Sequence, residues 1–258
     1  MTMSKKIYIN PGHSNKDPGA VGYETERKLN VKVAEYMNSY LLANYECKTK
    51  MTDYDNNSLS AVSAEANAWK ADLFVSIHFN AGGGDGYEAL VMSNERKELG
   101  KIFEKHVKAI GQNSRGVKLR PDLHVLKATT MPAILNEGAF VDNKKDIQDW
   151  NDNSELKKMG EAYAKAAAEY LKLSKKNTVE KVPEKYAPAN KEAKFEPYVV
   201  RVTASALNVR KGPGTNYAIA TVIRDKGAYT IVDESDSGFW GKLKSGAGWI
   251  SLRHTKKV

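Results

Sequence analysis

Apolar positions along the first two thirds of the chain follow two different periods. Between Glu26 and Asn44, apolar residues recur every four positions, at Leu29, Val33, Met37 and Leu41, which predicts an amphipathic helix. Asp72–Phe79 is a continuous run of apolar, β-branched and aromatic residues, typical of a buried central strand. The same criteria predict helices at 58–70, 95–111 and 153–173 and strands at 6–10, 87–92, 123–126 and 133–136.

This alternation of strands and helices favours an α/β fold, with a mostly parallel twisted sheet flanked by helices. The pattern ends at residues 174–197, where Lys, Glu, Pro and Ala predominate, and we interpret this stretch as a semi-extended linker. Residues 198–258 hold short β-rich runs between Gly- and Pro-rich turns, which predict a small all-β barrel domain. The chain is therefore expected to form two domains, at 1–173 and 198–258.

The composition excludes several classes of protein. With 41% hydrophobic and 28% charged residues among 258, the chain is an ordinary globular one, and no window is apolar enough for membrane insertion. The start reaches Pro11-Gly12 before a signal-like apolar run develops, so we expect synthesis in the cytoplasm without an ordinary export signal. The single Cys47 excludes a disulfide framework and a Cys-rich zinc module. Any metal would be held by His and carboxylate groups.

The formal charge of +9 raises nucleic acid as a partner, but its distribution argues against one. Residues 198–258 hold ten basic and four acidic residues, a net of +6, and residues 174–197 add +2. The first 173 residues are nearly balanced, with 24 basic and 23 acidic residues. Because the basic residues gather in the last third and the larger domain is nearly balanced, we expect no nucleic-acid partner.

Polar residues at three strand ends form the candidate site. His13 follows the first strand, His78 lies near the end of the most apolar strand, and Glu137 follows a later one, so all three are expected at one sheet edge. Glu26 shares the core-facing stripe of its helix, whereas Glu24 lies on another stripe.

Two imidazoles and one carboxylate are a common ligand set for catalytic Zn²⁺. His13, Glu26 and His78 fit that set, and Glu137 fits a non-ligating general base. From spacing alone the alternative stays open, since a histidine in an apolar strand is more often a hydrogen-bonded core residue.

Four sequence blocks, spanning about residues 5–173, resemble the zinc-dependent N-acetylmuramoyl-L-alanine amidases. They are Ile9–Ala20, Glu26–Asn30, Ala66–Ala81 and Pro132–Asn143, in the order of the family. The resemblance implies one Zn²⁺ held by His13, Glu26 and His78, with Glu137 as the catalytic glutamate. The chain departs from the family in lacking the arginine often found before Ala66-Asn67. The short segment after His13 also makes the choice of Glu26 over Glu24 depend on helix register.

Ala206–Tyr217 resembles the signature of bacterial Src-homology-3-like domains, with later strands matched around Trp240 and Trp249. Such domains usually bind peptidoglycan peptides or other wall polymers. Both tryptophans suit core packing in so small a barrel, and contact with ligand is the open alternative. The local net charge of +6 suits anionic wall polymers.

The two resemblances together imply a peptidoglycan hydrolase that cleaves the amide between N-acetylmuramic acid and L-alanine. Without an export signal, a phage or prophage endolysin that acts on the wall after release is expected. The alternatives are a host autolysin, a zinc peptidase acting within the stem peptide, and a non-enzymatic basic binding protein. The ligand of the second domain and the oligomeric state stay open.

Overall fold

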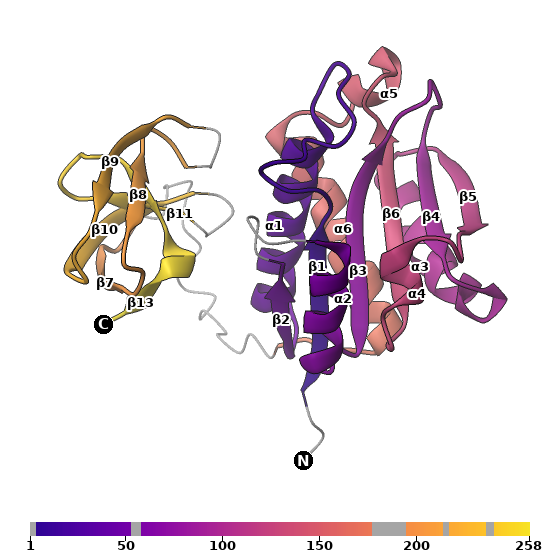
Figure 1. Cartoon of the computed structure of the whole chain (residues 1–258), viewed down its shortest axis with the longest axis horizontal. Helices are drawn as coiled ribbons and strands as arrows, with labels where there is room; N and C mark the ends of the chain where they lie inside the picture. The colour runs from indigo at the N-terminus through magenta and orange to yellow at the C-terminus, as the bar shows by residue number, and fades with distance from the viewer. Residues whose placement is uncertain (1–3, 53–57, 177–194, 214–216, 236–239) are drawn as a thin grey trace, which may run out of the picture. The chain divides into compact units, whose positions relative to one another are not determined.

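The computed structural model describes residues 4–52, 58–176, 195–213, 217–235 and 240–258. The chain divides into two units, Met1–Asn177 and Thr178–Val258 (Figure 1). Most of the stretch interpreted as a linker, residues 177–194, lies outside the described residues. No helix in the described ranges is long and apolar enough to cross a bilayer.

The first unit alternates strands and helices. Its strands are β1 (Lys5–Pro11), β2 (Cys47–Met51), β3 (Leu73–Asn80), β4 (Tyr87–Val91), β5 (Ser114–Leu119) and β6 (Ala133–Phe140). Its helices are α1 (Glu26–Asn44), α2 (Leu59–Ala68), α3 (Lys97–Lys108), α4 (His124–Lys127), α5 (Lys144–Gln148) and α6 (Asn153–Leu171), with a 3-10 turn η1 (Asn94–Arg96).

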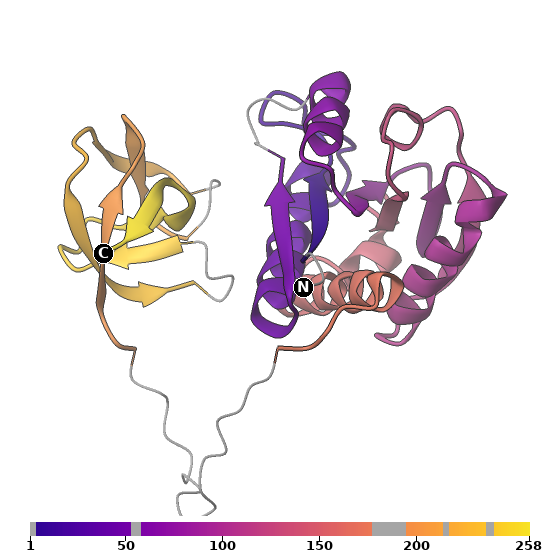
Figure 2. The ribbon, with the colours of Figure 1, turned by 90° about the horizontal axis from the view of Figure 1, so that it is seen from below.

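The six strands form one sheet in the order β2-β1-β3-β6-β4-β5. Neighbouring strands are parallel except β4 and β6, which run antiparallel, so the sheet is mixed. Helices cover both sides of it (Figure 2). The mostly parallel α/β sheet with flanking helices is therefore observed, with one reversed strand pair.

The two faces of this sheet carry different side chains, because successive residues of a strand alternate between faces. One face, here the α1/α6 face, packs against α1, α3 and α6 through a large apolar core; β3 contributes Leu73, Val75, Ile77 and Phe79 to it. The opposite α2/α4 face has a smaller apolar cluster, in which Phe74 of β3 meets α2 and α4. Further along β3, Ser76 and His78 lie on the same face of the sheet as Phe74. This face therefore becomes polar toward the carboxyl ends of β3 and β6.

The second unit is all-β. Its strands are β7 (Tyr198–Val202), β8 (Leu207–Arg210), β9 (Ile219–Ile223), β10 (Ala228–Glu234), β11 (Trp240–Leu243), β12 (Trp249–Ser251) and β13 (Thr255–Lys257), with a 3-10 turn η2 (Leu252–His254). They form one sheet in the order β13-β7-β10-β11-β12-β8-β9, and its neighbouring strands are antiparallel. Trp240 is buried, whereas Trp249 is half-buried with Lys242 Nζ 5.9 Å from its ring centroid.

Most predicted elements are confirmed, and the helix over 26–44 has the predicted bounds. The strand predicted at Leu123–Leu126 is wrong, because these residues enter the short helix α4. Val125 and Leu126 are buried in the smaller apolar cluster, and a short apolar run has no periodicity that separates strand from helix. The strand predicted at 133–136 continues to Phe140, so Glu137 lies inside β6 and not beyond its end.

Candidate metal centre and its neighbouring carboxylate

Three side chains of metal-ligand type converge in the first unit. His13 follows β1, Glu26 is the first residue of α1, and His78 lies in β3. One ligand atom from each lies within 4.8 Å of the others. The three residues that the sequence predicts as ligands are thus brought together, although 65 positions separate His13 from His78.

Glu26 lies between the two histidines. Its Oε2 is 3.0 Å from His13 Nε2, and its Oε1 is 2.8 Å from His78 Nδ1. The backbone amides of Ala20 and Phe79 donate to the same carboxylate. Burial opposes ionisation of this group, but the hydrogen bonds from both imidazoles outweigh burial and hold the pKa of Glu26 well below its usual range. Glu26 is therefore an ionised carboxylate, ready to accept a cation. Glu24, by contrast, pairs with Lys28.

A second carboxylate fixes the orientation of His13. Asp17 Oδ2 lies 2.8 Å from Nδ1 of His13, which leaves Nε2 directed to Glu26. Burial alone would lower the pKa of His13, but its hydrogen bonds to Glu26 and Asp17 raise that pKa to about 9. Such a carboxylate–histidine pair sets the tautomer and orientation of a metal-binding imidazole.

Close backbone approach makes room for the cluster. A Cβ on Gly12 would lie only 2.1 Å from Cε1 of His78, and one on Gly19 would lie 2.5 Å from Oε2 of Glu26. His13 itself has a φ of 65°, in the left-handed region that non-glycine residues seldom adopt. The backbone at Gly12 and Gly19 therefore packs directly against the side chains of the cluster.

Glu137 lies beside this cluster. It pairs in register with His78 across the parallel β3–β6 ladder, so the two side chains leave neighbouring strands on the same α2/α4 face. Its Oε2 is buried, with no hydrogen-bond partner among the described residues. Burial raises the pKa of Glu137 to about 7; the charge of His78 opposes this shift, and those of Glu26 and Glu88 add to it. This carboxyl can therefore gain and lose a proton near neutral pH.

On the other side of Glu137 lies a second charged group that the sequence does not single out. Glu88 of β4 pairs in register with Glu137 across the antiparallel ladder. Arg115 Nε and Lys118 Nζ donate to its Oε1 over 2.6 and 2.5 Å. The only sequence signal was a glutamate inside an otherwise apolar strand, at Tyr87–Val91.

The remaining histidines lie outside this site. His106 pairs with Glu169 between α3 and α6, and His124 and His254 are exposed.

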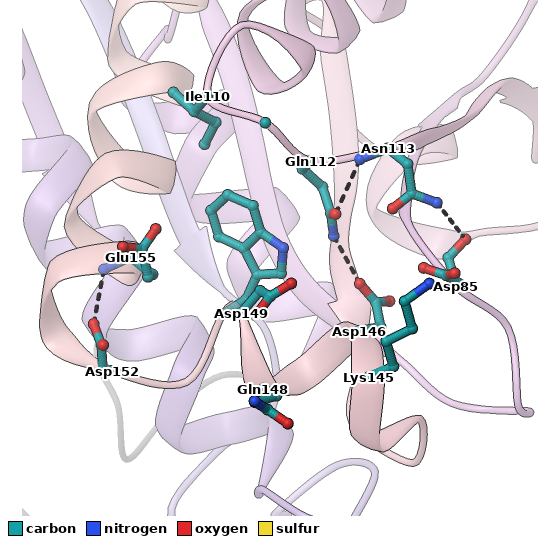
Figure 3. Close-up of a pocket in the computed structure, with 12 residues that line it drawn as sticks. Asp85, Ile110, Gln112, Asn113, Lys145, Asp146, Gln148, Asp149, Asp152 and Glu155 are labelled. Carbon is teal, nitrogen blue, oxygen red and sulfur yellow. Dashed lines mark hydrogen bonds between the residues drawn. The ribbon is translucent and has the colours of Figure 1, made fainter.

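A separate pocket of about 700 Å³ is lined by residues that include Asp85, Gln112 and Asp146 (Figure 3). Gln112 donates to Asp146, which also accepts from two backbone amides, so these buried groups are occupied in holding loops together.

The donor set fits a divalent ion of the zinc type. Two imidazole nitrogens and an ionised carboxylate oxygen can face one ion, Asp17 supports one imidazole, and a partly buried carboxyl without a ligand role lies alongside. Such a site on a mixed α/β sheet is the arrangement of a metal-dependent hydrolase.

Comparison with known proteins places the chain in a family of this class. The profile of the N-acetylmuramoyl-L-alanine amidase family matches residues 7–169, and the chain belongs to that family. The chain is 35% identical to the endolysin of Bacillus phage SPP1 over 188 residues, covering 68% of this chain and 69% of that protein. It is 32% identical to the N-acetylmuramoyl-L-alanine amidase CwlM of Bacillus licheniformis, covering 66% and 70% of the two chains.

The fold of the chain is also similar to that of a solved amidase structure. The catalytic domain of CwlV, an N-acetylmuramoyl-L-alanine amidase from Bacillus (Paenibacillus) polymyxa var. colistinus, matches with a TM-score of 0.62 at 30% identity. The match covers 66% of this chain and 99% of that domain. The likeness thus concerns one part of the chain, and the family match places it in the first unit.

Proposed function

We propose that the chain is a zinc-dependent peptidoglycan hydrolase that cleaves the amide bond between N-acetylmuramic acid and the L-alanine of the stem peptide. The observation that carries the proposal is the His13–Glu26–His78 cluster beside the partly buried Glu137, in a member of this amidase family. The similarity to an endolysin further supports a phage or prophage lysin that acts on the wall after release.

In this proposal His13, Glu26 and His78 hold one Zn²⁺. When bound, zinc supplies Lewis-acid polarisation of a carbonyl and lowers the pKa of water. The low pKa of Glu26 keeps it anionic, and Asp17 keeps His13 oriented. Binding of the ion would displace the hydrogen bonds between Glu26 and the histidines and would release the proton that these carboxylates hold on His13.

Glu137 performs the proton transfers. It accepts a proton as water attacks the lactyl carbonyl, and it then donates that proton to the departing nitrogen of L-alanine. In the metal-free protein burial raises the pKa of Glu137 to about 7, and burial favours the protonated form that the second step needs. Its Oε2 has no protein partner in the described part of the chain, so no internal bond must break first.

For the second unit we propose binding to the cell wall, with residues 198–258 as a Src-homology-3-like domain joined by a linker at 174–197 to a catalytic domain at 1–173. Its antiparallel sheet and net charge of +6 support contact with anionic wall polymers. Trp249, which is half-buried, is better placed for ligand contact than the buried Trp240.

Digestion of purified wall sacculi tests the proposal. We expect new N-terminal L-alanine together with free lactyl ends on muramic acid, identified by mass spectrometry. New amino termini within the stem peptide would instead indicate a zinc peptidase and overturn the amidase assignment. Dialysis against a chelator should abolish release, and one equivalent of zinc per chain should restore it.

A further inference from the structure

We propose that Arg115 and Lys118 form a recognition subsite for a carboxylate of the stem peptide, on the leaving-group side of Glu137. This inference rests on the proposed amidase function and specifies which form of the peptide the site prefers.

The subsite is built around one buried anion. Arg115 and Lys118 both donate to Oε1 of Glu88, whose side chain is only 8% exposed. The two cationic side chains remain 43% and 42% exposed. Two cations share one carboxylate, so the group carries an excess positive charge that faces solvent next to Glu137.

An irregularity in β5 makes this convergence possible. Residues three apart in a regular strand point to opposite faces of the sheet. Between the pairs Tyr87–Ser114 and Ala89–Val117 the register shifts, because β5 contains one more residue than β4 there. Gly116 adopts a φ of 87° within this bulge. Arg115 and Lys118 therefore reach the same carboxylate, as bulges beside active sites often re-aim side chains.

Arg115 is also held in a fixed position. The carbon of its guanidinium lies 5.4 Å from the centroid of the Phe140 ring, and its Nε is bound to Glu88. A guanidinium fixed at Nε still presents its terminal nitrogens, which bind a carboxylate in a bidentate manner. Such prior ordering lowers the entropic cost of binding a charged ligand.

The proposed reaction directs the peptide toward this group. Glu137 must reach the nitrogen of L-alanine, so the leaving peptide lies on its side of the metal cluster. The sheet order continues from β6 through β4 to β5, away from His78 on β3 (Figure 1). In peptidoglycan the second residue of the stem is linked through its side-chain carboxyl, which leaves its α-carboxyl free or amidated. That group is about 7 Å from the cleaved nitrogen in an extended peptide, within reach of long side chains from β5.

The test compares soluble disaccharide–pentapeptides whose second residue carries either a free α-carboxylate or the neutral amide. We expect the wild-type protein to cleave the acid form with a kcat/KM about tenfold above that of the amide form. Arg115→Gln and Lys118→Gln, made singly so that Glu88 keeps one partner, should each bring this ratio close to one. Glu88→Gln should raise the ratio, because it removes the internal competitor for both cations.

Lys158→Gln is the matched control, since Lys158 is an exposed lysine on α6 that pairs with Glu155. It should leave the ratio unchanged, and thermal unfolding of every variant reports whether it folds. Equal cleavage of both forms by the wild type, or equal loss on both forms in the Arg115 and Lys118 variants, would overturn the subsite. If sacculi yield no N-terminal L-alanine at all, the amidase function itself fails, which is a different result.

Discussion

The two faces of the six-stranded sheet show how one β3 sequence serves stability and chemistry separately. Toward α1 and α6 the strand presents Leu73, Val75, Ile77 and Phe79, all buried in the larger core. Toward the other side it presents Phe74, Ser76 and His78, so apolar packing gives way to a polar site within one strand. Substitutions on the α1/α6 face should therefore change stability, and substitutions on the α2/α4 face should change chemistry.

The largest expected effect concerns activity on the α2/α4 face. Glu137→Gln keeps the shape of the side chain but removes its proton transfer, so release of N-terminal L-alanine should fall by about 10²–10⁴-fold. Zinc content per chain should stay at the wild-type value, because Glu137 is not among the three clustered residues proposed to hold the ion. Glu155→Gln on α6 is the control. Retained wall hydrolysis by Glu137→Gln would contradict the proposed role.

The opposite face should respond in stability alone. Phe103 of α3 is fully buried in the larger core, so Phe103→Ala should lower the free energy of unfolding of the first unit by about 3–5 kcal/mol. Urea unfolding measures this loss. For the fraction that remains folded, kcat should match the wild type. A fall in kcat beyond the loss of folded protein would show that the two faces are coupled.

A smaller expected effect is a dependence of stability on pH that comes from Glu137, the residue proposed to carry the activity. Glu137 has a folded pKa of about 7 against an ordinary value of 4.5, so between these values the folded state binds more protons than the unfolded state. Its stabilising contribution is therefore present below about 4.5 and lost as pH rises through about 7. In metal-free protein, Glu137→Gln should gain on the order of 2 kcal/mol relative to wild type between pH 5 and pH 8. If the free energy of unfolding changed equally with pH in the wild type and in Glu137→Gln, the raised pKa of Glu137 would be contradicted.

The smallest expected effect concerns Asp17, which orients the proposed zinc ligand His13. Asp17 is exposed, so Asp17→Asn should change the free energy of unfolding little. It removes the carboxylate that holds Nδ1 of His13, and zinc affinity should fall about tenfold. Competition with a chromophoric chelator measures the affinity. Unchanged affinity would show that the backbone alone orients His13.

The sequence predicts those features that periodicity encodes. The stripe of Leu29, Val33, Met37 and Leu41 predicts α1, and the same stripe places Glu26, and not Glu24, toward the histidines. The direction of β4 was not predictable, since a short apolar strand has the same pattern whether its neighbour is parallel or antiparallel. Glu88 therefore could not be placed opposite Glu137.

Local geometry was equally out of reach. The bulge at Gly116 depends on the pairing of β4 with β5, and the positions of the His78 and His13 imidazoles depend on the space left by Gly12 and Gly19. Motif similarity supplied the four site residues and included Asp17 in its first block without giving it a role, but it did not supply Arg115 or Lys118. Arg115 and Lys118 meet Glu88 only when β5 pairs with β4, whereas Asp17 contacts His13 four positions away in the same loop.

Because position 12 must be glycine, the site can be damaged by mutation at a residue that has no side chain. The imidazole of His78 occupies the volume that any Cβ at this position would need. In a saturation screen for wall lysis, substitutions of Gly12 should therefore be as damaging as those of the histidine, although glycine donates no ligand atom. Tolerance maps of such enzymes will then outline the shape of the site as well as its chemistry.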